Sequence, residues 1–395
     1  MSLILKIFIL YYCSCTSCSL FCFLSYTLSH SLSHSLSPMD FSAPTQTKCM
    51  AFMTPGGQAT PHEITRRACG PNDIVIDIKF AGICHSDIHT ARDEWGKALY
   101  PLVPGHEIAG PIVAVGSDVK GFSVGDIGGV GCMVDSCRTC NSCRKGDEQY
   151  CSTGAVFTYN SKLKYNVENG ADTYGGYSKH IVIDASFALK VPTNLDLAAA
   201  TPLMCAGITM YSPMINFGLQ PHMKFAVAGL GGLGHVGVKL GHAFGCHTTC
   251  ISRGTSKKDT AINHLGADAY IDATSEEEMK AAAGTLDFVI STISAQYDVA
   301  SYLNLLKPDG KFIVVGVPPG DVSLQLGGLI GGRRTLAGSL IGGVRETQDM
   351  LDFCGRHNIT CDIELITADR INEAYDRTVA SDVKYRFVID TASIV

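Results

Sequence analysis

The sequence predicts an α/β protein in which a mostly-β domain is interrupted by a doubly wound parallel sheet of six strands. Residues 74–131 consist of short β segments separated by glycine and proline turns, such as "DIVIDIKFAG" and "EIAGPIVAVG". From about Leu195 strands alternate with helices, which is typical of a parallel sheet with both faces covered. After Gly343 a helical segment is followed by the β-like "YRFVID", so we expect the chain to return to the first domain.

The alternating region divides into elements that can be taken in chain order. Its predicted strands are the segments "KFAVAG", "HTTCIS", "AYID", "LDFVIST", "GKFIVVG" and "RTLAGSLIG". A helical period is present before the first strand in "LAAATPLMCAGITMYSPMINF", and between strands in "GHVGVKLGHAFG", "SKKDTAINHLG" and "DVASYLNLLK". We therefore assign the mostly-β domain to residues 48–204 and 342–395, and the parallel sheet to residues 205–341.

Length, charge and cysteine content limit the classes of protein that the chain can be. Its 395 residues are enough for two domains with full hydrophobic cores. A formal net charge of −6 gives no electrostatic reason to expect nucleic acid as a partner. Four of the 17 cysteines crowd into one short segment, which favours an intracellular metalloprotein over a secreted disulfide scaffold. We therefore expect a reducing compartment and a cytoplasmic protein.

Residues 1–47 stand apart from the remainder and are left out of the fold prediction. Met1–Leu24 is apolar, and Ser29–Ser37 is a low-complexity run of Ser, Leu and His. A signal peptide or membrane anchor is one interpretation. We favour an upstream extension of the reading frame with Met39 as the true start, because no small-residue cleavage site stands out. No membrane contact is expected unless residues 1–38 act as an anchor.

The most specific motif is a cluster of four cysteines at the spacing C-x2-C-x2-C-x7-C. It consists of Cys137, Cys140, Cys143 and Cys151. Four thiolates so close in sequence can surround one tetrahedral Zn²⁺, and a closed shell of four sulfurs leaves no position for water. The motif therefore predicts a structural zinc. A redox dithiol, which needs only two cysteines, or four unrelated thiols are the alternatives.

A glycine-rich turn lies between the predicted strand "KFAVA" and a helix. The turn contains Gly229, Gly231, Gly232, Leu233 and Gly234. Glycines at this spacing permit a tight turn, a close approach of backbone N–H groups to a pyrophosphate and close helix packing. In this strand–turn–helix context they predict a Rossmann-type dinucleotide site, with a merely structural turn as the alternative.

The end of the next strand predicts which dinucleotide is bound. An NAD-selective site usually has an acidic residue there for the ribose hydroxyls. This chain has Ser252 and Arg253, then Lys257, and no acid before Asp259. A hydroxyl and cations suit a 2′-phosphate, because charge-assisted hydrogen bonds to phosphate are strong. NADP(H) is therefore the expected cofactor, and ordinary solvated surface is the alternative.

Three further segments carry residues that could hold a second metal. Cys84 follows a predicted strand, His106 follows a proline-rich turn, and Cys205 precedes the parallel sheet. A lone cysteine or histidine is more often structural. No spacing rule brings these three residues together.

Taken together, the motifs resemble those of a known family. The segments "GICHSDIH", "PLVPGHEIAG", "GVGCMVDSCRTCNSCRKGDEQYC", "PLMCAGITMYSP", "GLGGLGH" and "DVKYRFVID" resemble the zinc-containing medium-chain alcohol dehydrogenases. They are most similar to the cinnamyl-alcohol-dehydrogenase-like aldehyde reductase branch. The resemblance covers about Cys49 to Asp390. It implies a GroES-like catalytic domain, an inserted Rossmann domain, two zinc ions per subunit and a homodimer.

The resemblance also implies a role for individual residues around the catalytic zinc. Cys84, His106 and Cys205 match the metal ligands, and a Cys₂His set leaves the fourth position open for substrate. Glu107 matches an acid close to the metal, and Asp87 is expected to orient His106. Ser86 and His89 match a proton relay that ends at solvent.

For the cofactor and substrate, the resemblance implies a further set of contacts. His85 is expected near the pyrophosphate, and Thr209 and Leu233 near the nicotinamide. The carboxamide is expected at Val315, Gly316 and Val317. Trp95 is expected to border the substrate pocket, with a structural aromatic as the alternative.

The implied activity is hydride transfer between NADP(H) and aldehydes or primary alcohols, with aromatic or medium-chain aldehydes favoured. A polyol (mannitol-type) dehydrogenase is the alternative within the family. A non-catalytic relative would have lost a ligand or the relay hydroxyl, and all of these are present. A secreted or anchored disulfide protein is the alternative from a different class.

Overall fold

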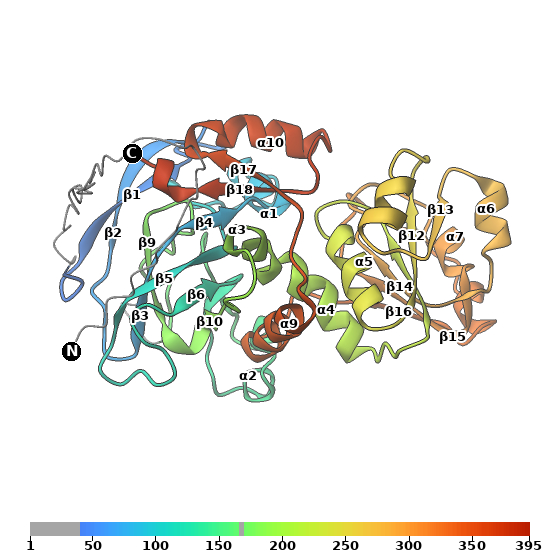
Figure 1. Ribbon diagram of the computed structural model, residues 1–395, viewed down its shortest axis with the longest axis horizontal. Helices are drawn as coiled ribbons and strands as arrows, with labels where there is room; N and C mark the ends of the chain where they lie inside the picture. The colour runs from blue at the N-terminus through green and yellow to red at the C-terminus, as the bar shows by residue number, and fades with distance from the viewer. Residues whose placement is uncertain (1–39, 166–169) are drawn as a thin grey trace, which may run out of the picture. The chain divides into compact units, whose positions relative to one another are not determined.

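The predicted parallel sheet of six strands is present and has the order β13-β12-β11-β14-β15-β16 (Figure 1). The computed structural model describes residues 40–165 and 170–395, so most of the predicted extension 1–47 lies outside the described residues. All five strand pairs of this sheet are parallel. The strand order reverses between β11 and β14, which is where doubly wound sheets bind their ligands. The strands are β11 (Lys224–Ala228), β12 (His247–Ser252), β13 (Ala269–Asp272), β14 (Leu286–Ser291), β15 (Leu306–Val314) and β16 (Thr335–Gly338).

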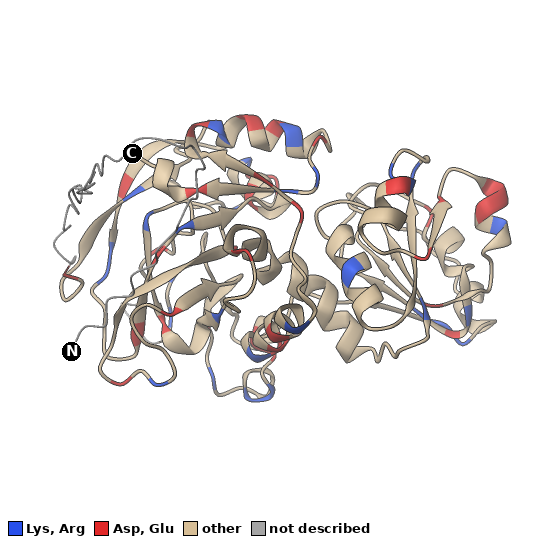
Figure 2. Ribbon diagram, viewed as in Figure 1, with Lys and Arg blue, Asp and Glu red and all other residues tan. Residues whose placement is uncertain are grey.

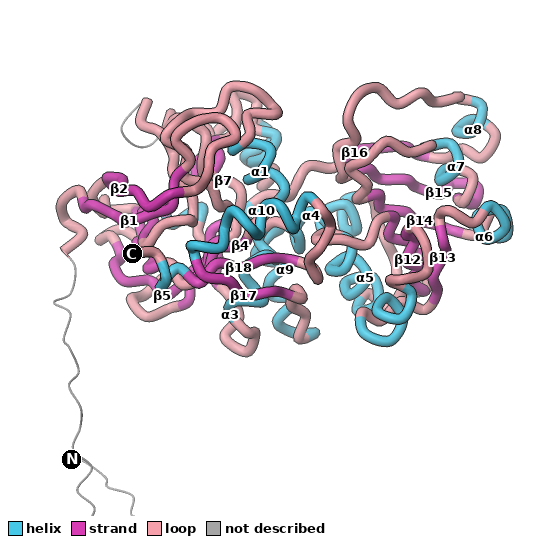
Figure 3. The backbone as a smooth tube through the Cα atoms, turned by 90° about the horizontal axis from the view of Figure 1, so that it is seen from above, coloured by secondary structure: helices cyan, strands magenta, loops and turns pink. Residues whose placement is uncertain are grey.

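The central strands of this sheet have nearly continuous apolar sequences because both faces are covered. In β11 and β14, Phe225, Val227, Phe288 and Ile290 are all buried. In Figures 1 and 3 the helices that alternate with these strands along the chain lie beside the sheet. These helices are α5 (Gly234–Ala243), α6 (Glu276–Ala281), α7 (Val299–Leu303) and α8 (Gly327–Ile330), with a π-helical turn at Thr260–His264.

An eight-stranded, mostly antiparallel sheet is built from the two parts of the chain that flank the parallel sheet. Its main path is β10-β6-β5-β4-β18-β17, and β3 pairs with both β5 and β9. The C-terminal β18 pairs with β4, so the chain does return to its first part as expected. The strands are β3 (Asp73–Asp77), β4 (Phe80–Gly82), β5 (Ile108–Val115), β6 (Ile127–Val130), β9 (His180–Asp184), β10 (Leu189–Lys190), β17 (Ile363–Thr367) and β18 (Arg386–Asp390).

Two small antiparallel pairs and the remaining helices complete the fold. The pairs are β1 (Thr45–Ala51) with β2 (Thr60–Arg66), and β7 (Met133–Asp135) with β8 (Val156–Phe157). The helices are α1 (His85–Ala91), α2 (Asn141–Lys145), α3 (Leu197–Ala200), α4 (Ala206–Asn216), α9 (Val344–His357) and α10 (Ile371–Val379). Short 3-10 turns lie at Glu148–Tyr150, Ala185–Phe187, Thr201–Met204, Ala368–Arg370 and Thr391–Ser393. Helix α10 carries the acidic Glu373 and Asp376 and the basic Arg377, and Figure 2 shows acidic residues in red and basic ones in blue.

The structure departs from the sequence-based elements in several places, and the short helices α6 and α8 were not predicted. Helix α1 lies within the stretch 74–131, which reads as β segments, because seven residues are too few to show a helical period. Its N-cap is Cys84, whose backbone N–H donates to the Asp87 carboxylate in a capping box. The segment "DVASYLNLLK" is helical only to Leu303, and its last residues begin β15.

Two further findings concern the environment of the protein. All 13 cysteines among residues 40–165 and 170–395 are free thiols. Within the same residues, no helix has the length and apolar character needed to cross a bilayer.

Candidate functional site

The four clustered cysteines converge as their spacing predicts. The sulfurs of Cys137, Cys140, Cys143 and Cys151 all lie within 4.8 Å of one another. The Cys137 and Cys143 sulfurs are 3.8 Å apart, and those of Cys140 and Cys143 are 3.4 Å apart. A tetrahedral zinc with Zn–S bonds of about 2.3 Å requires sulfurs roughly 3.8 Å apart. Backbone N–H groups of Cys140 and Thr139 lower the pKa of Cys137 to about 5, which favours a thiolate.

A second buried group unites the three distant segments. Donor atoms of Cys84, His106, Glu107 and Cys205 also lie within 4.8 Å of one another. The Cys84 and Cys205 sulfurs are 4.0 Å apart, although 121 residues separate them in the sequence. This distance too fits two thiolates on one zinc. The donor set therefore suits a transition metal with soft ligands.

Strand pairing explains how this group assembles. Strand β4 leads into Cys84, and strand β5 follows Glu107; the two strands pair through Ala81 and Ile108. The 3-10 turn Thr201–Met204 packs against β4, β5 and β6 and delivers Cys205. The sulfur of Met204 packs against Gly129 in β6. A Cβ at Gly129 would lie only 2.5 Å from that sulfur, so a larger residue would not fit. The glycines of "GDIGGVGC" thus permit close packing next to a member of the group.

Asp87 holds His106 in a fixed orientation. Its carboxylate is fully buried, and one oxygen lies 3.3 Å from Nδ1 of His106. The other oxygen accepts hydrogen bonds from the backbone N–H of Cys84 and the hydroxyl of Tyr177. With Nδ1 engaged, Nε2 of His106 is free to act as a donor atom toward the cysteines. This is the arrangement expected for Asp87.

Glu107 forms a buried ion pair with Arg386. A guanidinium nitrogen of Arg386 donates to Oε1, while Oε2 is buried without a hydrogen-bond partner. Burial raises the pKa of Glu107 to about 8, although the charge of Arg386 acts in the opposite direction. Gly82 faces this carboxylate, and a Cβ at Gly82 would lie 2.0 Å from Oε2. Oε2 lies near Cys84 and His106 and has no hydrogen-bond partner, so it is available to a cation bound there.

Arg386 lies within the segment "DVKYRFVID", and no role was predicted for it. Its aliphatic stem lies against the glycine turn, because a Cβ at Gly232 would be 2.9 Å from Cδ of Arg386. Arg386 therefore joins the metal-binding group to the predicted pyrophosphate site. No local pattern reveals this, since Glu107 and Arg386 are 279 residues apart.

The glycine turn has the geometry of a phosphate-binding loop. Gly229 has a φ of +97°, and a Cβ at Gly234 would lie 1.9 Å from the Gly229 carbonyl oxygen, so both positions require glycine. A cavity of about 90 Å³ lies beside the turn. Its lining includes His85, Leu230, Gly231, Gly232, Lys257 and Arg386. The Lys257 ammonium donates to the Leu230 carbonyl at 2.7 Å, so a cation lies against the turn.

The other predicted cofactor residues lie at the carboxyl ends of strands or near Cys205. Ser252 ends β12, and the next residue, Arg253, is exposed. Thr209 is buried one turn after Cys205, and Leu233 precedes α5. Val315, Gly316 and Val317 follow β15, where the Val315 N–H donates to Ser291 O and Val317 is 75% exposed. Thr292, which the sequence analysis did not single out, donates to the carbonyls of Ala228 and Gly229 and fixes the turn.

The predicted relay residues lie on α1 beside Cys84. The Ser86 hydroxyl is 3.7 Å from the Cys84 sulfur. Nδ1 of His89 pairs with the carboxylate of Glu94, and the Trp95 ring stacks on His89 at 5.0 Å between centroids. Trp95 is 58% exposed, so it contacts solvent as well as His89. Glu94 was missed, because helix α1, which ends at Ala91 shortly before it, was not predicted.

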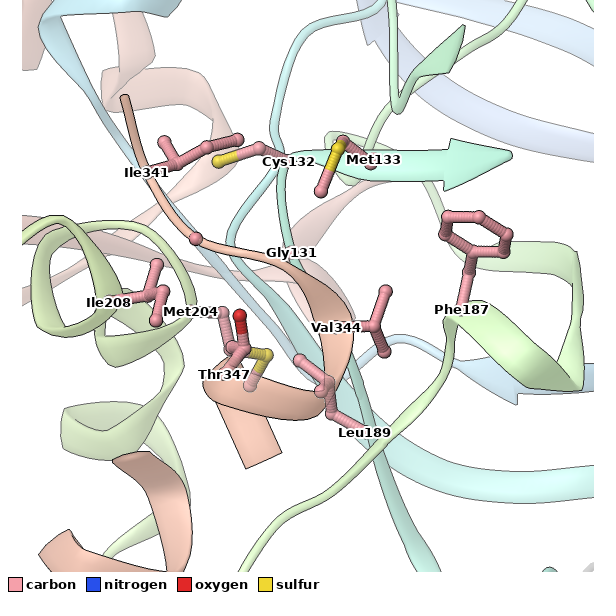
Figure 4. Close-up of a pocket in the computed structure, with 11 residues that line it drawn as sticks. Gly131, Cys132, Met133, Phe187, Leu189, Met204, Ile208, Ile341, Val344 and Thr347 are labelled. Carbon is pink, nitrogen blue, oxygen red and sulfur yellow. The ribbon is translucent and has the colours of Figure 1, made fainter. Parts of the chain in front are cut away.

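A small cavity is lined by Cys132 and by Met204, the residue before Cys205 (Figure 4). In Figure 4, Cys132 and Ile341 lie near each other at one end, and Met204, Ile208 and Leu189 lie along the cavity. Its volume of about 20 Å³ has room for one water molecule but not for an aldehyde. This cavity is therefore a packing feature next to Cys205, not a substrate site.

Comparisons with known proteins agree with this geometry. Residues 70–193 match the alcohol dehydrogenase GroES-like domain, and residues 232–356 match the zinc-binding dehydrogenase family. The chain is 52% identical over 336 residues to NADP-dependent alcohol dehydrogenase C 1 of Mycolicibacterium smegmatis, covering 85% of this chain and 95% of that protein. It is 49% identical to a probable mannitol dehydrogenase of Medicago sativa, covering 85% and 92%.

Among solved structures, the chain is similar to the CAD of Helicobacter pylori complexed with NADP(H). The TM-score is 0.83 at 40% identity, covering 89% of this chain and 100% of that one. The chain belongs to the zinc-binding alcohol dehydrogenase family, with a GroES-like domain and a Rossmann-like parallel sheet.

Proposed function

We propose that this chain is a zinc-dependent oxidoreductase that interconverts primary alcohols and aldehydes with NADP(H), with reduction of aromatic or medium-chain aldehydes favoured. The observation that carries the proposal is the buried group of Cys84, His106 and Cys205, joined by Arg386 to the glycine turn. A metal-binding group and a dinucleotide loop in such proximity suit hydride transfer to a polarised carbonyl.

The residues present fit two zinc ions. Cys84, His106 and Cys205 are the ligands of a catalytic zinc, and Glu107 is the acid beside it. The closed set of Cys137, Cys140, Cys143 and Cys151 holds a structural zinc. When bound, the catalytic zinc supplies a Lewis acid, and NADP(H) supplies the hydride.

The chain's own groups position the metal ligands and move the proton. Asp87 keeps His106 in the tautomer whose Nε2 faces Cys84 and Cys205. Ser86 is placed to exchange a proton with the substrate oxygen, because its hydroxyl lies beside the Cys84 sulfur. His89 passes that proton to solvent, and Glu94 and Trp95 fix its imidazole from two sides.

The cofactor is held at the carboxyl ends of β11, β12 and β15. Backbone N–H groups of the turn Gly229–Gly234, with His85 and Arg386, receive the pyrophosphate. Ser252, Arg253 and Lys257 receive the 2′-phosphate. When bound, the nicotinamide would be received by Thr209 and Leu233, and the backbone of residues 315–317 would receive its carboxamide. Arg253→Ala should raise the KM for NADPH more than that for NADH, and equal effects would oppose this assignment.

The substrate is an aldehyde or alcohol whose apolar group packs near Trp95. A mannitol-type dehydrogenase is the second candidate, because a relative at 49% identity carries that name. Initial rates with benzaldehyde, cinnamaldehyde and mannitol separate the two. Turnover of the aldehydes with NADPH supports the first proposal, and turnover of mannitol alone supports the second.

We further propose that the protein is a homodimer formed through β16. This strand is an edge of the parallel sheet, and its Leu336 is exposed. Nearby Leu326, Ile330 and Leu340 are 62%, 80% and 48% exposed. An exposed apolar edge strand is suited to pairing with a second copy. Sedimentation should give a dimer, and Leu336→Glu should give a monomer; a monomeric parent protein would refute this interface.

The remaining proposals concern domain boundaries and location. We place the catalytic domain at residues 48–204 and 342–395 and the NADP-binding domain at 205–341. The free thiols of the described residues suit a reducing, cytoplasmic environment. Limited proteolysis and cell fractionation test the two proposals separately.

A further inference from the structure

Arg66, the last residue of β2, is a buried cation without a carboxylate partner. It is 8% exposed, and its terminal nitrogens donate to the Tyr174 carbonyl at 2.7 Å, the Gly175 carbonyl at 2.9 Å and the Ser178 hydroxyl at 2.8 Å. All three acceptors are neutral. Burial lowers the pKa of Arg66 to about 10, which means that the buried positive charge is poorly compensated. Buried charges are normally paired with an opposite charge, so a counterion is expected beside the Arg66 guanidinium.

Polar atoms without partners lie on the same face of the β1–β2 pair as Arg66. Thr45 is directly opposite Arg66 in the register, and Thr47 is opposite Ile64. Opposed residues of an antiparallel pair point to the same face, and so do residues two apart along a strand. The hydroxyls of Thr45 and Thr47 and the Nε of Arg66 are buried without a hydrogen-bond partner. Three polar atoms on this inner face therefore lack partners, and of their residues Arg66 lines a cavity.

A cavity of about 280 Å³ lies at this end of the β1–β2 pair. Its lining includes Pro44, Thr65, Arg66, Thr158, Thr173 and Tyr174. The volume is sufficient for a phosphate or a short carboxylate with a few water molecules. The cavity is distinct from the one beside the glycine turn, with which it shares no lining residue.

Each of the other charged residues that line this cavity contacts an opposite charge from outside the lining. Asp135 and Asp184 both contact Arg138, at 2.9 Å and 3.1 Å. Asp172 contacts Lys162, and Arg67 contacts Asp73. Among the lining ions that the structure describes, Arg66 is the one without an opposite charge. The attraction for an anion is therefore local to Arg66, because the three acidic lining residues contact other cations.

We propose that this cavity binds a small oxyanion, which is held at the Arg66 guanidinium, with the unpartnered Thr45 hydroxyl beside it on the same face of the β1–β2 pair. Charge-assisted hydrogen bonds from a desolvated guanidinium are the strong class, and they account for a cation buried among neutral acceptors. The site is independent of the proposed catalytic activity. Tetrahedral inorganic anions and planar carboxylates share the required chemistry.

The test is calorimetric titration of the full-length holoenzyme at constant ionic strength with phosphate, sulfate and acetate in separate runs. Saturating NADPH fills the phosphate subsites of the cofactor site, so that they do not contribute. One saturable site per chain for at least one of these anions is expected, and the run that shows it identifies the anion geometry. No saturable binding of any of the three would overturn the proposal.

Variants locate the site. Arg66→Leu should abolish saturable binding, whereas Lys120→Leu, which removes an exposed cation and the same charge, should leave it unchanged. Thr45→Val retains the shape of the strand and should weaken binding about tenfold, as expected for one hydrogen bond to a charged group. It serves as the deciding variant if Arg66→Leu does not fold. Unchanged affinity in Thr45→Val and in any folded Arg66→Leu protein would refute the site.

Discussion

Arg386 on β18 donates a hydrogen bond to the buried carboxylate of Glu107, which precedes β5 and belongs to the metal-binding group. Both side chains are almost fully buried, at 5% and 0% exposure. Because the stem of Arg386 also lies against Gly232, one side chain connects the C-terminal strand, the metal-binding group and the dinucleotide turn. This contact links the part of the chain that precedes the parallel sheet with the part that follows it.

Arg386→Leu is expected to lower the free energy of unfolding by about 3–5 kcal/mol, because it leaves a buried carboxylate without its partner. It should also raise the KM for NADPH more than tenfold. Urea unfolding and steady-state kinetics measure the two effects. The control is Arg333→Leu, which breaks an exposed pair with Asp309 and should change stability far less. Similar losses in both variants would show that the buried pair has no special role.

Asp87→Asn is expected to reduce either kcat or the affinity for the catalytic zinc by about 10–100-fold, because the orienting partner of His106 loses its charge. Metal analysis after mild chelation should show loss of one zinc per chain, with the structural zinc retained. Tyr177→Phe removes one hydrogen bond to the same carboxylate and should have a smaller effect. An Asp87→Asn enzyme with normal zinc content and kcat would contradict this role.

The two cysteine groups should respond differently to substitution. Cys84→Ala should abolish turnover and leave the fold largely intact, because it removes a ligand of the catalytic metal. Cys143→Ala should destabilise the chain, because structural zinc contributes free energy of folding. Thermal unfolding and metal content distinguish the two results. Loss of turnover at full stability in Cys143→Ala would argue against a structural site.

His235 is expected to make the protein less stable as the pH falls below about 6.5. Burial lowers its pKa from 6.5 to about 3, so below pH 6.5 the unfolded chain binds a proton that the folded chain does not. The stability contribution is thus present above pH 6.5 and lost on acidification, by about 1.5–2 kcal/mol between pH 6.5 and 5. His235→Gln should show a correspondingly shallower decrease than the parent protein, whereas substitution of the exposed His357 should not. Parallel pH profiles would refute the prediction.

The sequence predicted those parts of the site whose residues are close in the chain. The four clustered cysteines and the glycine turn were recognisable from spacing, because short loops force their members together. Cys84, His106 and Cys205 were not, because the pairing of β4 with β5 and the packing of the turn Thr201–Met204 unite them, and only the family resemblance pointed to them.

Residues whose function depends on a distant partner were missed. Arg386 and Thr292 have no local signature, because their hydrogen-bond partners are distant in the sequence. Arg386 donates to Glu107, and Thr292 donates to the carbonyl of Gly229. Helix α1 was missed because it is short and its start is defined by a capping contact between Cys84 and Asp87. The strands of the parallel sheet were predicted best, because apolar strands alternate there with helices, whereas the short helices α6 and α8 were not predicted.

The most direct test of the account is a comparison of initial rates with NADPH and NADH over a panel of aromatic and medium-chain aldehydes, with the zinc-loaded protein. We expect turnover of these aldehydes, a kcat/KM at least tenfold higher with NADPH, and loss of activity when the catalytic zinc is removed. Equal or higher rates with NADH would contradict the assignment of Ser252, Arg253 and Lys257, and activity that persists without zinc would contradict the proposed mechanism.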